Sequence, residues 1–320
     1  MKKTILIPIL FVCFSFTLVK DSINPTQYKI FSSKNLKEAS VTDIVAEMQN
    51  YDVLFFGEEH NDSVAHFLQN EVLKAMYTSF GPNTTLSMEM FESDCQMVVD
   101  EYLQGFIREK NFTKEARSWS NYRNYKPMVE FAKEKKLNVI AANAPARYVN
   151  MAARNGLSSL NQLSKTAKRF LPPLPYDTAT GAYYTKFTDL MSDGRNAGVP
   201  SKDTSKAVVA APAPSMSSMM PKHLIHSQSL WDAGMAYSIS NVFKTNKKAK
   251  VLQLNGRFHS DQGFGAVAQL KKYNPKLRIL IISCFNGESN FPNSLKPEDH
   301  KNLGDYIIYT DPTVPRTYKD

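Results

Sequence analysis

Short apolar runs alternate with amphipathic stretches along most of this 320-residue chain. Residues 51–57 form an apolar run that ends at a glycine, a pattern typical of a strand buried on both faces. Residues 64–76 then place apolar side chains at helical spacing. The same alternation predicts strands at 85–90, 137–142, 250–256 and 277–282, an edge strand at 305–309, and helices at 94–103 and 127–136. Strands that alternate with helices predict an α/β fold, with a mainly parallel sheet flanked by helices.

The segment between the third and fourth of these strands has helical patterns and no clear strand pattern. We therefore expect a smaller helical domain at 146–244, inserted between the two parts of the sheet domain at 41–145 and 245–310. Within it, residues 194–221 are rich in Pro, Ser, Ala and Lys and have little hydrophobic pattern, which predicts a mobile loop.

The amino end has the pattern of a secretory signal peptide over residues 1–20: two lysines, an uncharged apolar run and a polar exit. The run is shorter than the ~20 residues that a spanning helix needs, so it favours export over a transmembrane anchor. Cys13 raises the question of a lipid anchor, but no small residue directly precedes it. We expect an exported protein, in the periplasm or associated with a membrane, and the sequence leaves lipid anchoring open.

The composition, 42% apolar and 22% charged residues, is typical of a globular protein and excludes a low-complexity chain. The net charge of +9 is spread along the sequence and no nucleic-acid-binding motif accompanies it, so we expect no nucleic-acid partner. Cys95 and Cys284 could form a disulfide, but their apolar surroundings favour two buried thiols.

Polar residues follow several of the predicted strands at the points where the strands end. Glu58 ends the first strand and Glu89 the second, while two Gly-x-x-His motifs place His60 after the first strand and His259 after the fourth. Ligands of parallel sheets bind beyond the carboxyl ends of the strands. We therefore expect these side chains to converge on one rim of the sheet.

Two histidines with one or two glutamates are suitable ligands for a divalent metal ion that keeps positions open for water. A glutamate outside the ligand set, Glu58 or Glu89, could act as general base on that water. His60 could instead cap the helix that follows it while Glu58 lies in solvent. The residues by themselves leave the role of the rim open.

Tyrosines are numerous, 15 in all, and several lie in the predicted helical domain, Tyr148, Tyr183 and Tyr184 among them. A phenolate can bind haem iron, and arginines beside apolar walls suit a porphyrin and its propionates. Tyrosines that serve only in packing give the same composition, so the composition does not decide between haem binding and ordinary packing.

Five segments of the chain form a characteristic set: residues 57–62 (GEEHND), 87–91 (SMEMF), 142–145 (ANAP), 228–236 (QSLWDAGMA) and 255–259 (NGRFH). Together they resemble the ChaN-like family of bacterial, iron-regulated haem-binding proteins, which are often lipoproteins, and the likeness spans about residues 41–282. The resemblance implies a parallel α/β domain with a smaller helical domain. It also implies an exported protein of haem or iron acquisition, haem held through a tyrosine, a homodimer with paired haems and an outer-membrane haem receptor as partner. Tyr148, three residues after the end of the Ala-Asn-Ala-Pro segment, is our first candidate for the haem-binding residue, followed by Tyr183 and Tyr184.

The wider superfamily includes the Tiki metalloproteases and erythromycin esterase-like hydrolases, which are similar in having two Gly-x-x-His motifs and an essential glutamate. The matching positions here are His60, His259 and Glu89, with Glu58 beside them. This more distant likeness implies the alternative of a divalent-metal-dependent hydrolase of the esterase or protease type, with Glu58 and Glu89 as its catalytic carboxylates. The sequence favours the haem carrier and leaves catalytic activity open.

Overall fold

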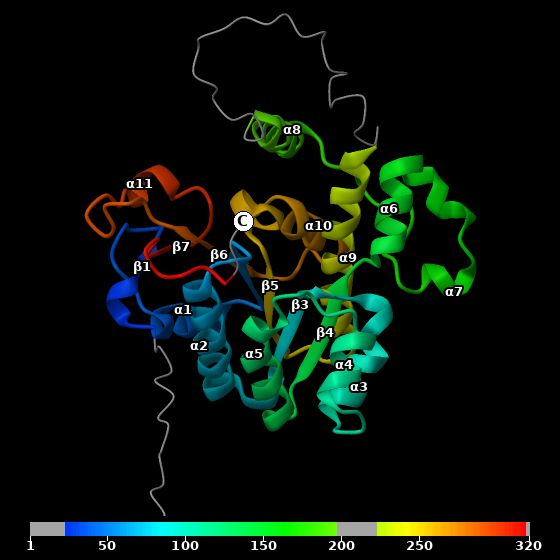
Figure 1. The fold of residues 1–320 in the computed structure, drawn as a ribbon, viewed down its shortest axis with the longest axis horizontal. Coiled ribbons are helices and arrows are strands. Elements are labelled where there is room, and N and C mark those ends of the chain that lie inside the picture. The colour runs from blue at the N-terminus through cyan, green and yellow to red at the C-terminus, as the bar shows by residue number, and fades with distance from the viewer. Residues whose placement is uncertain (1–22, 197–222, 318–320) are drawn as a thin grey trace, which may run out of the picture.

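The computed structural model describes residues 23–196 and 223–317 (Figure 1). The predicted signal peptide, residues 1–20, and all but the first three residues of the predicted mobile loop at 194–221 lie outside that description. Within it, no helix is both long and apolar enough to cross a membrane.

Seven strands of the described chain form a single sheet with the order β1-β7-β6-β2-β5-β3-β4. Only β1 and β7 pair in antiparallel fashion, and every other neighbouring pair is parallel. The predicted α/β fold with a mainly parallel sheet is therefore confirmed. The strands are β1 (Tyr28–Ser32), β2 (Val53–Glu58), β3 (Thr84–Glu92), β4 (Asn138–Asn143), β5 (Lys250–Gly256), β6 (Ile279–Asn286) and β7 (Tyr306–Thr310).

Helices cover both faces of the sheet. They are α1 (Val41–Glu47), α2 (Ser63–Phe80), α3 (Gln96–Leu103), α4 (Glu109–Glu115), α5 (Tyr122–Lys135), α6 (Ala146–Asn155), α7 (Lys165–Lys168), α8 (Gly181–Asn196), α9 (Leu224–Thr245), α10 (Gly265–Tyr273) and α11 (Pro297–His300). Alternate residues of β2 point to opposite faces, as the pleat requires. Leu54 and Phe56 pack with the core formed by α1, α2 and α5, whereas Val53 and Phe55 pack with α9 and α10.

The range 146–244 contains α6 to α9, and a separate apolar cluster joins α6 to the first half of α9. The second half of α9 packs directly on the sheet through residues such as Ile239. Helix α9 thus connects the helical region to the sheet domain, and the division of the chain into two domains stays a prediction.

Two sequence predictions differ in detail from the structure. The predicted edge strand is β7, but β1 pairs outside it, so β7 is an inner strand. Pro127 lies inside α5 rather than at its start, because the helix extends back to Tyr122 and buries Tyr122 and Tyr125. The preference for buried thiols is confirmed, since Cys95 and Cys284 are both free and buried.

Candidate functional site

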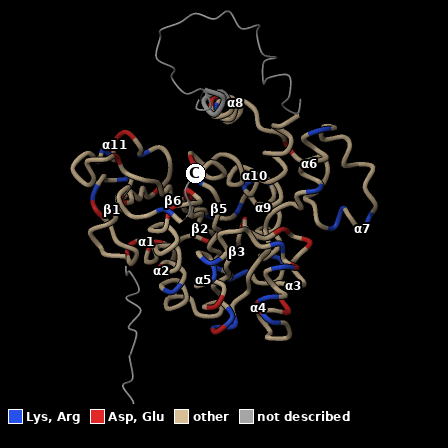
Figure 2. The backbone as a smooth tube through the Cα atoms, in the orientation of Figure 1, with Lys and Arg blue, Asp and Glu red and all other residues tan. Residues whose placement is uncertain are grey.

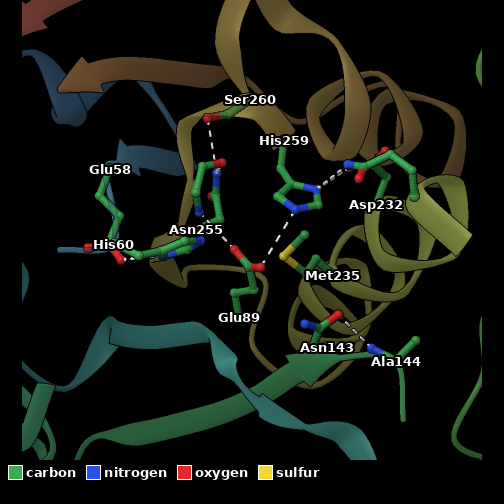
Figure 3. A network of polar contacts seen from close by, with 12 residues as sticks. Glu58, His60, Glu89, Asn143, Ala144, Asp232, Met235, Asn255, His259 and Ser260 are labelled. Carbon is green, nitrogen blue, oxygen red and sulfur yellow. Dashed lines mark hydrogen bonds and ion pairs between the residues drawn. The ribbon is translucent and has the colours of Figure 1, made fainter. Parts of the chain in front are cut away.

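The carboxyl ends of β2, β3 and β5 bring the predicted rim residues together (Figure 3). Glu89 from β3 lies between the two histidines. One of its oxygens accepts a hydrogen bond of 2.7 Å from the backbone N–H of Gly256, and the other lies 3.6 Å from Nε2 of His259. His60 follows β2 and contacts Glu58. Glu58, His60, Glu89 and His259 therefore share one rim, as the strand ends predict.

Glu58 is a buried carboxylate with several donors around it. Its oxygens accept hydrogen bonds of 2.5 Å from the Tyr125 hydroxyl and from Gln69 Nε2, and they lie 2.9 Å from His60 Nδ1 and 3.1 Å from His66 Nδ1. Burial would raise the pKa of Glu58, but the contacts with His66 and His60 hold this pKa well below its ordinary value. The carboxylate is thus held in its ionised form by His66 of α2 and by His60, which follows β2.

His60 is the partly exposed member of the rim, with 34% of its side chain accessible. Its ring packs edge-on against Trp119 at 5.0 Å between centroids. Burial lowers the pKa of His60, but the hydrogen bond to Glu58 and the charges of Glu89 and Glu58 outweigh it and raise this pKa to about 9. The imidazole is therefore protonated at neutral pH.

His259 belongs to a second, more deeply buried part of the rim. Its Nδ1 lies 2.7 Å from a carboxylate oxygen of Asp232 on α9, and Asp232 is itself buried. Burial lowers the pKa of His259, but the charges of Glu89 and Asp232 together with the hydrogen bond to Asp232 raise it above its ordinary value. A histidine held by one carboxylate and facing another is equipped to bind or transfer a proton.

Tyr183 from α8 extends this buried chain. Its hydroxyl donates a 2.8 Å hydrogen bond to Asp232 and accepts one of 3.1 Å from Gln228. Burial, followed by the charge of Asp232 and the hydrogen bond to it, raises the pKa of Tyr183 far above its ordinary value. Gly265 makes room for the contact, because a Cβ there would lie 2.8 Å from Asp232 Oδ1 and 2.9 Å from the Tyr183 hydroxyl.

The other two predicted tyrosines do not join the rim network. Tyr184 is 47% exposed on α8. Tyr148 lies on α6, partly buried against the apolar cluster of that helix, with the guanidinium carbon of Arg147 4.4 Å from its ring centroid. Arg147 also pairs with Asp94, which precedes α3.

The sequence missed His66, Gln69, Tyr125 and Asp232 as partners of the rim. All four lie on helices. Each of these helices has several polar positions, and the local sequence pattern does not show which of them is buried. Asp232 alone had a signal in the sequence, because it lies in the segment 228–236 that carries part of the family likeness.

The geometry gives no support to the predicted divalent metal at His60, His259, Glu58 and Glu89. Residues 23–196 and 223–317 contain no group of three or more His, Cys, Asp or Glu side chains that could hold a metal ion. The reason lies in the contacts above: Glu58 already accepts four donors from the protein, and Nδ1 of each histidine faces a carboxylate.

Comparison with known proteins gives one family match. The family described as "Haem-binding uptake, Tiki superfamily, ChaN" matches residues 44–270. Among solved structures, the chain is similar to ChaN of Campylobacter jejuni, described with cofacial heme binding, at a TM-score of 0.63 and 17% identity over 89% of this chain and 97% of that one. The type III effector HopBA1 matches at a TM-score of 0.46 and 12% identity, over 90% of this chain and 99% of that one. No curated protein matches.

Proposed function

Because this chain belongs to the ChaN family of haem-binding uptake proteins in the Tiki superfamily, we propose that it binds haem and takes part in haem or iron acquisition. The observation that carries the proposal is the family match. It covers residues 44–270, which include both the rim and the whole of the helical region from α6 to α9.

We propose that Tyr148 is the residue that would hold the haem iron through its phenolate oxygen. Phenolate oxygen is one of the ligands by which proteins hold haem iron, and a bound haem supplies iron in a form that can be carried. Tyr148 combines partial exposure, an apolar neighbourhood and the adjacent Arg147 guanidinium. Arginine suits either the phenolate or a haem propionate, so the side chains around Tyr148 fit the group.

The other two tyrosines fit less well. Tyr184 is accessible, and we place it second. Tyr183 is buried and its hydroxyl proton is held by Asp232, so a porphyrin would have to displace that contact to reach the oxygen. We place Tyr183 third for this reason.

Substitution of Tyr148 by Phe tests the assignment. We expect the ferric haem complex to lose its tyrosinate charge-transfer absorption and haem affinity to fall at least about tenfold, the scale seen when metal sites lose a supporting contact. Tyr28→Phe is the matched control, because Tyr28 is also partly buried but lies on β1 at the far edge of the sheet. If Tyr148→Phe retains the absorption and Tyr184→Phe loses it, Tyr184 is the ligand instead.

We further propose export, with a periplasmic or membrane-associated location, a homodimer on haem binding and an outer-membrane haem receptor as partner. The signal-like pattern at residues 1–20 supports export. The cofacial heme binding described for Campylobacter jejuni ChaN supports a paired arrangement. Sedimentation velocity with and without haemin tests the dimer: we expect the mass to double with haemin, and an unchanged monomer would contradict it.

The family match favours haem binding over the divalent-metal hydrolase. The hydrolase would use Glu58 and Glu89, yet the described residues hold no metal-binding group. It would gain support only if metal analysis of the purified protein found stoichiometric metal that is lost in His259→Ala.

A further inference from the structure

The amino ends of the parallel strands form a second face, opposite the rim. Four segments enter β2, β4, β5 and β6 there, and we call them together the basic face: residues 47–52, 133–137, 244–250 and 273–278. In Figure 1 the lower end of α5, which belongs to this face, lies at the bottom of the view, while α8 and α10 lie at the top near the rim.

Positive charge that is scattered in the sequence gathers on this face. Its four segments contain nine Lys and Arg and three acidic residues, a net charge of 9 − 3 = +6, whereas the whole chain carries +9. Contacts join the segments: Arg278 Nε lies 3.6 Å from a carboxylate oxygen of Asp52, and Lys250 Nζ donates to the carbonyl of Met48 at 2.9 Å. The segments before β2, β5 and β6 are therefore direct neighbours at the amino ends of these strands.

Helix termini explain only part of this charge. Lysines in the last turn of a helix interact favourably with the helix dipole, which accounts for Lys133, Lys135 and Lys244. Lys247, Lys248 and Lys276 lie beyond any helix, are exposed, and form no ion pair within the part of the chain that the structure describes. The stability of the folded monomer therefore does not explain why these three lysines are present.

An exposed aromatic side chain adjoins the same face. Phe106, in the turn between α3 and α4, is 74% exposed and lines a groove of about 620 Å³ whose charged lining residues are Lys133, Lys136 and Asp100. Lys and Arg are blue and Asp and Glu are red in Figure 2, and both colours appear at the lower end of α5. An apolar side chain bordered by lysines is typical of surfaces that touch the headgroup region of a membrane.

We propose that the basic face docks on the surface of an anionic phospholipid bilayer. Each Lys or Arg near such a surface contributes about 1 kcal/mol, so the exposed lysines together are sufficient for reversible binding at low salt. Phe106 adds apolar contact at one edge. In this orientation the rim with Glu89 and His259 faces away from the membrane. The docking does not depend on haem.

Vesicle sedimentation of the full chain tests the proposal. Partition onto phosphatidylcholine vesicles containing 30% phosphatidylglycerol is compared with partition onto phosphatidylcholine alone, which corrects for any contribution of the apolar amino end. We expect the anionic-to-neutral ratio to fall about a hundredfold in the Lys247→Gln/Lys248→Gln/Lys276→Gln variant, from about 1 kcal/mol per lysine and 1.4 kcal/mol per tenfold. Raising the salt to 0.5 M should have a similar effect, because exposed charges are screened.

The matched control is Arg154→Gln/Lys165→Gln/Lys301→Gln, which removes the same charge from exposed positions away from the basic face. It should change the ratio less than threefold. Equal losses in the two variants would mean that net charge alone drives binding and would overturn the proposal. Binding to duplex DNA that depends on Lys247, Lys248 and Lys276, without binding to anionic vesicles, would overturn it in favour of a nucleic-acid partner.

Discussion

Gly256 lets β5 pass directly beside the imidazole of His60. A Cβ at this position would lie 2.7 Å from His60 Nε2, closer than non-bonded atoms approach. The glycine of the second Gly-x-x-His motif therefore serves the histidine of the first one. The two motifs are parts of a single packing arrangement at the rim.

Substitution of Gly256 by Ala should lower the free energy of unfolding by about 1–3 kcal/mol, because the extra methyl overfills this contact. Urea denaturation followed by circular dichroism measures the change. The double variant Gly256→Ala/His60→Ala lacks the imidazole that the added methyl group would contact. Without His60, the Gly256→Ala substitution should lower the free energy of unfolding much less than it does when His60 is present. If the alanine costs the same with and without the imidazole, the close approach is not the cause.

The protonation of His60 gives a stability change with pH. Its pKa rises from 6.5 in the unfolded chain to about 9 in the folded one, so the protonated imidazole stabilises the fold fully below pH 6.5. This contribution is lost as the pH rises through 9. Between pH 6 and pH 9.5 the wild type should lose more unfolding free energy than His60→Gln, which does not titrate. Equal losses would contradict the raised pKa.

Helix α3 protects the open edge of the sheet at β4. The side chain of Gln96 donates to the carbonyl of Val139 and accepts from the N–H of Ala141, both at 2.8 Å, where a further strand would otherwise bond. A cavity of about 430 Å³ lies along the same edge and is lined in part by Gln96. The Gln96 amide thus forms hydrogen bonds with backbone groups of β4 that would otherwise be free to pair with a strand of another chain.

Gln96→Ala should destabilise the protein by about 1–2 kcal/mol, since it leaves two backbone groups of β4 without partners. Gln104→Ala is the control, because Gln104 is the glutamine directly after α3 and is exposed. It should stay within about 0.5 kcal/mol of the wild type. The same loss in both variants would mean that helix propensity, not the edge contact, is being measured.

The elements with strong periodicity could be predicted from the sequence, and those set by tertiary contact could not. The strand from Val53 to Glu58 is apolar at nearly every position, as burial on both faces requires. Strand β1 has only one buried residue, Ile30, so no pattern distinguishes it from a loop. The first turn of α5 forms because Tyr122 and Tyr125 bury their rings, which overrides the usual place of a proline at the start of a helix.

At the scale of the whole molecule, the sheet separates two surfaces of different character. Buried carboxylates and histidines occupy the carboxyl ends of the strands, and exposed lysines occupy the amino ends. The rim could be predicted because parallel strands align their ends. The basic face could not, because its segments are far apart in the sequence and lie at one end of the sheet only through the strand order β6-β2-β5-β3-β4.

The central claim is that this protein binds haem at a defined site. Titration of the purified chain with haemin, followed by the Soret absorption, tests it most directly. We expect a shifted Soret band that grows to a sharp end point at a fixed ratio of haem to protein. A featureless titration that rises without saturation would contradict haem binding by this chain.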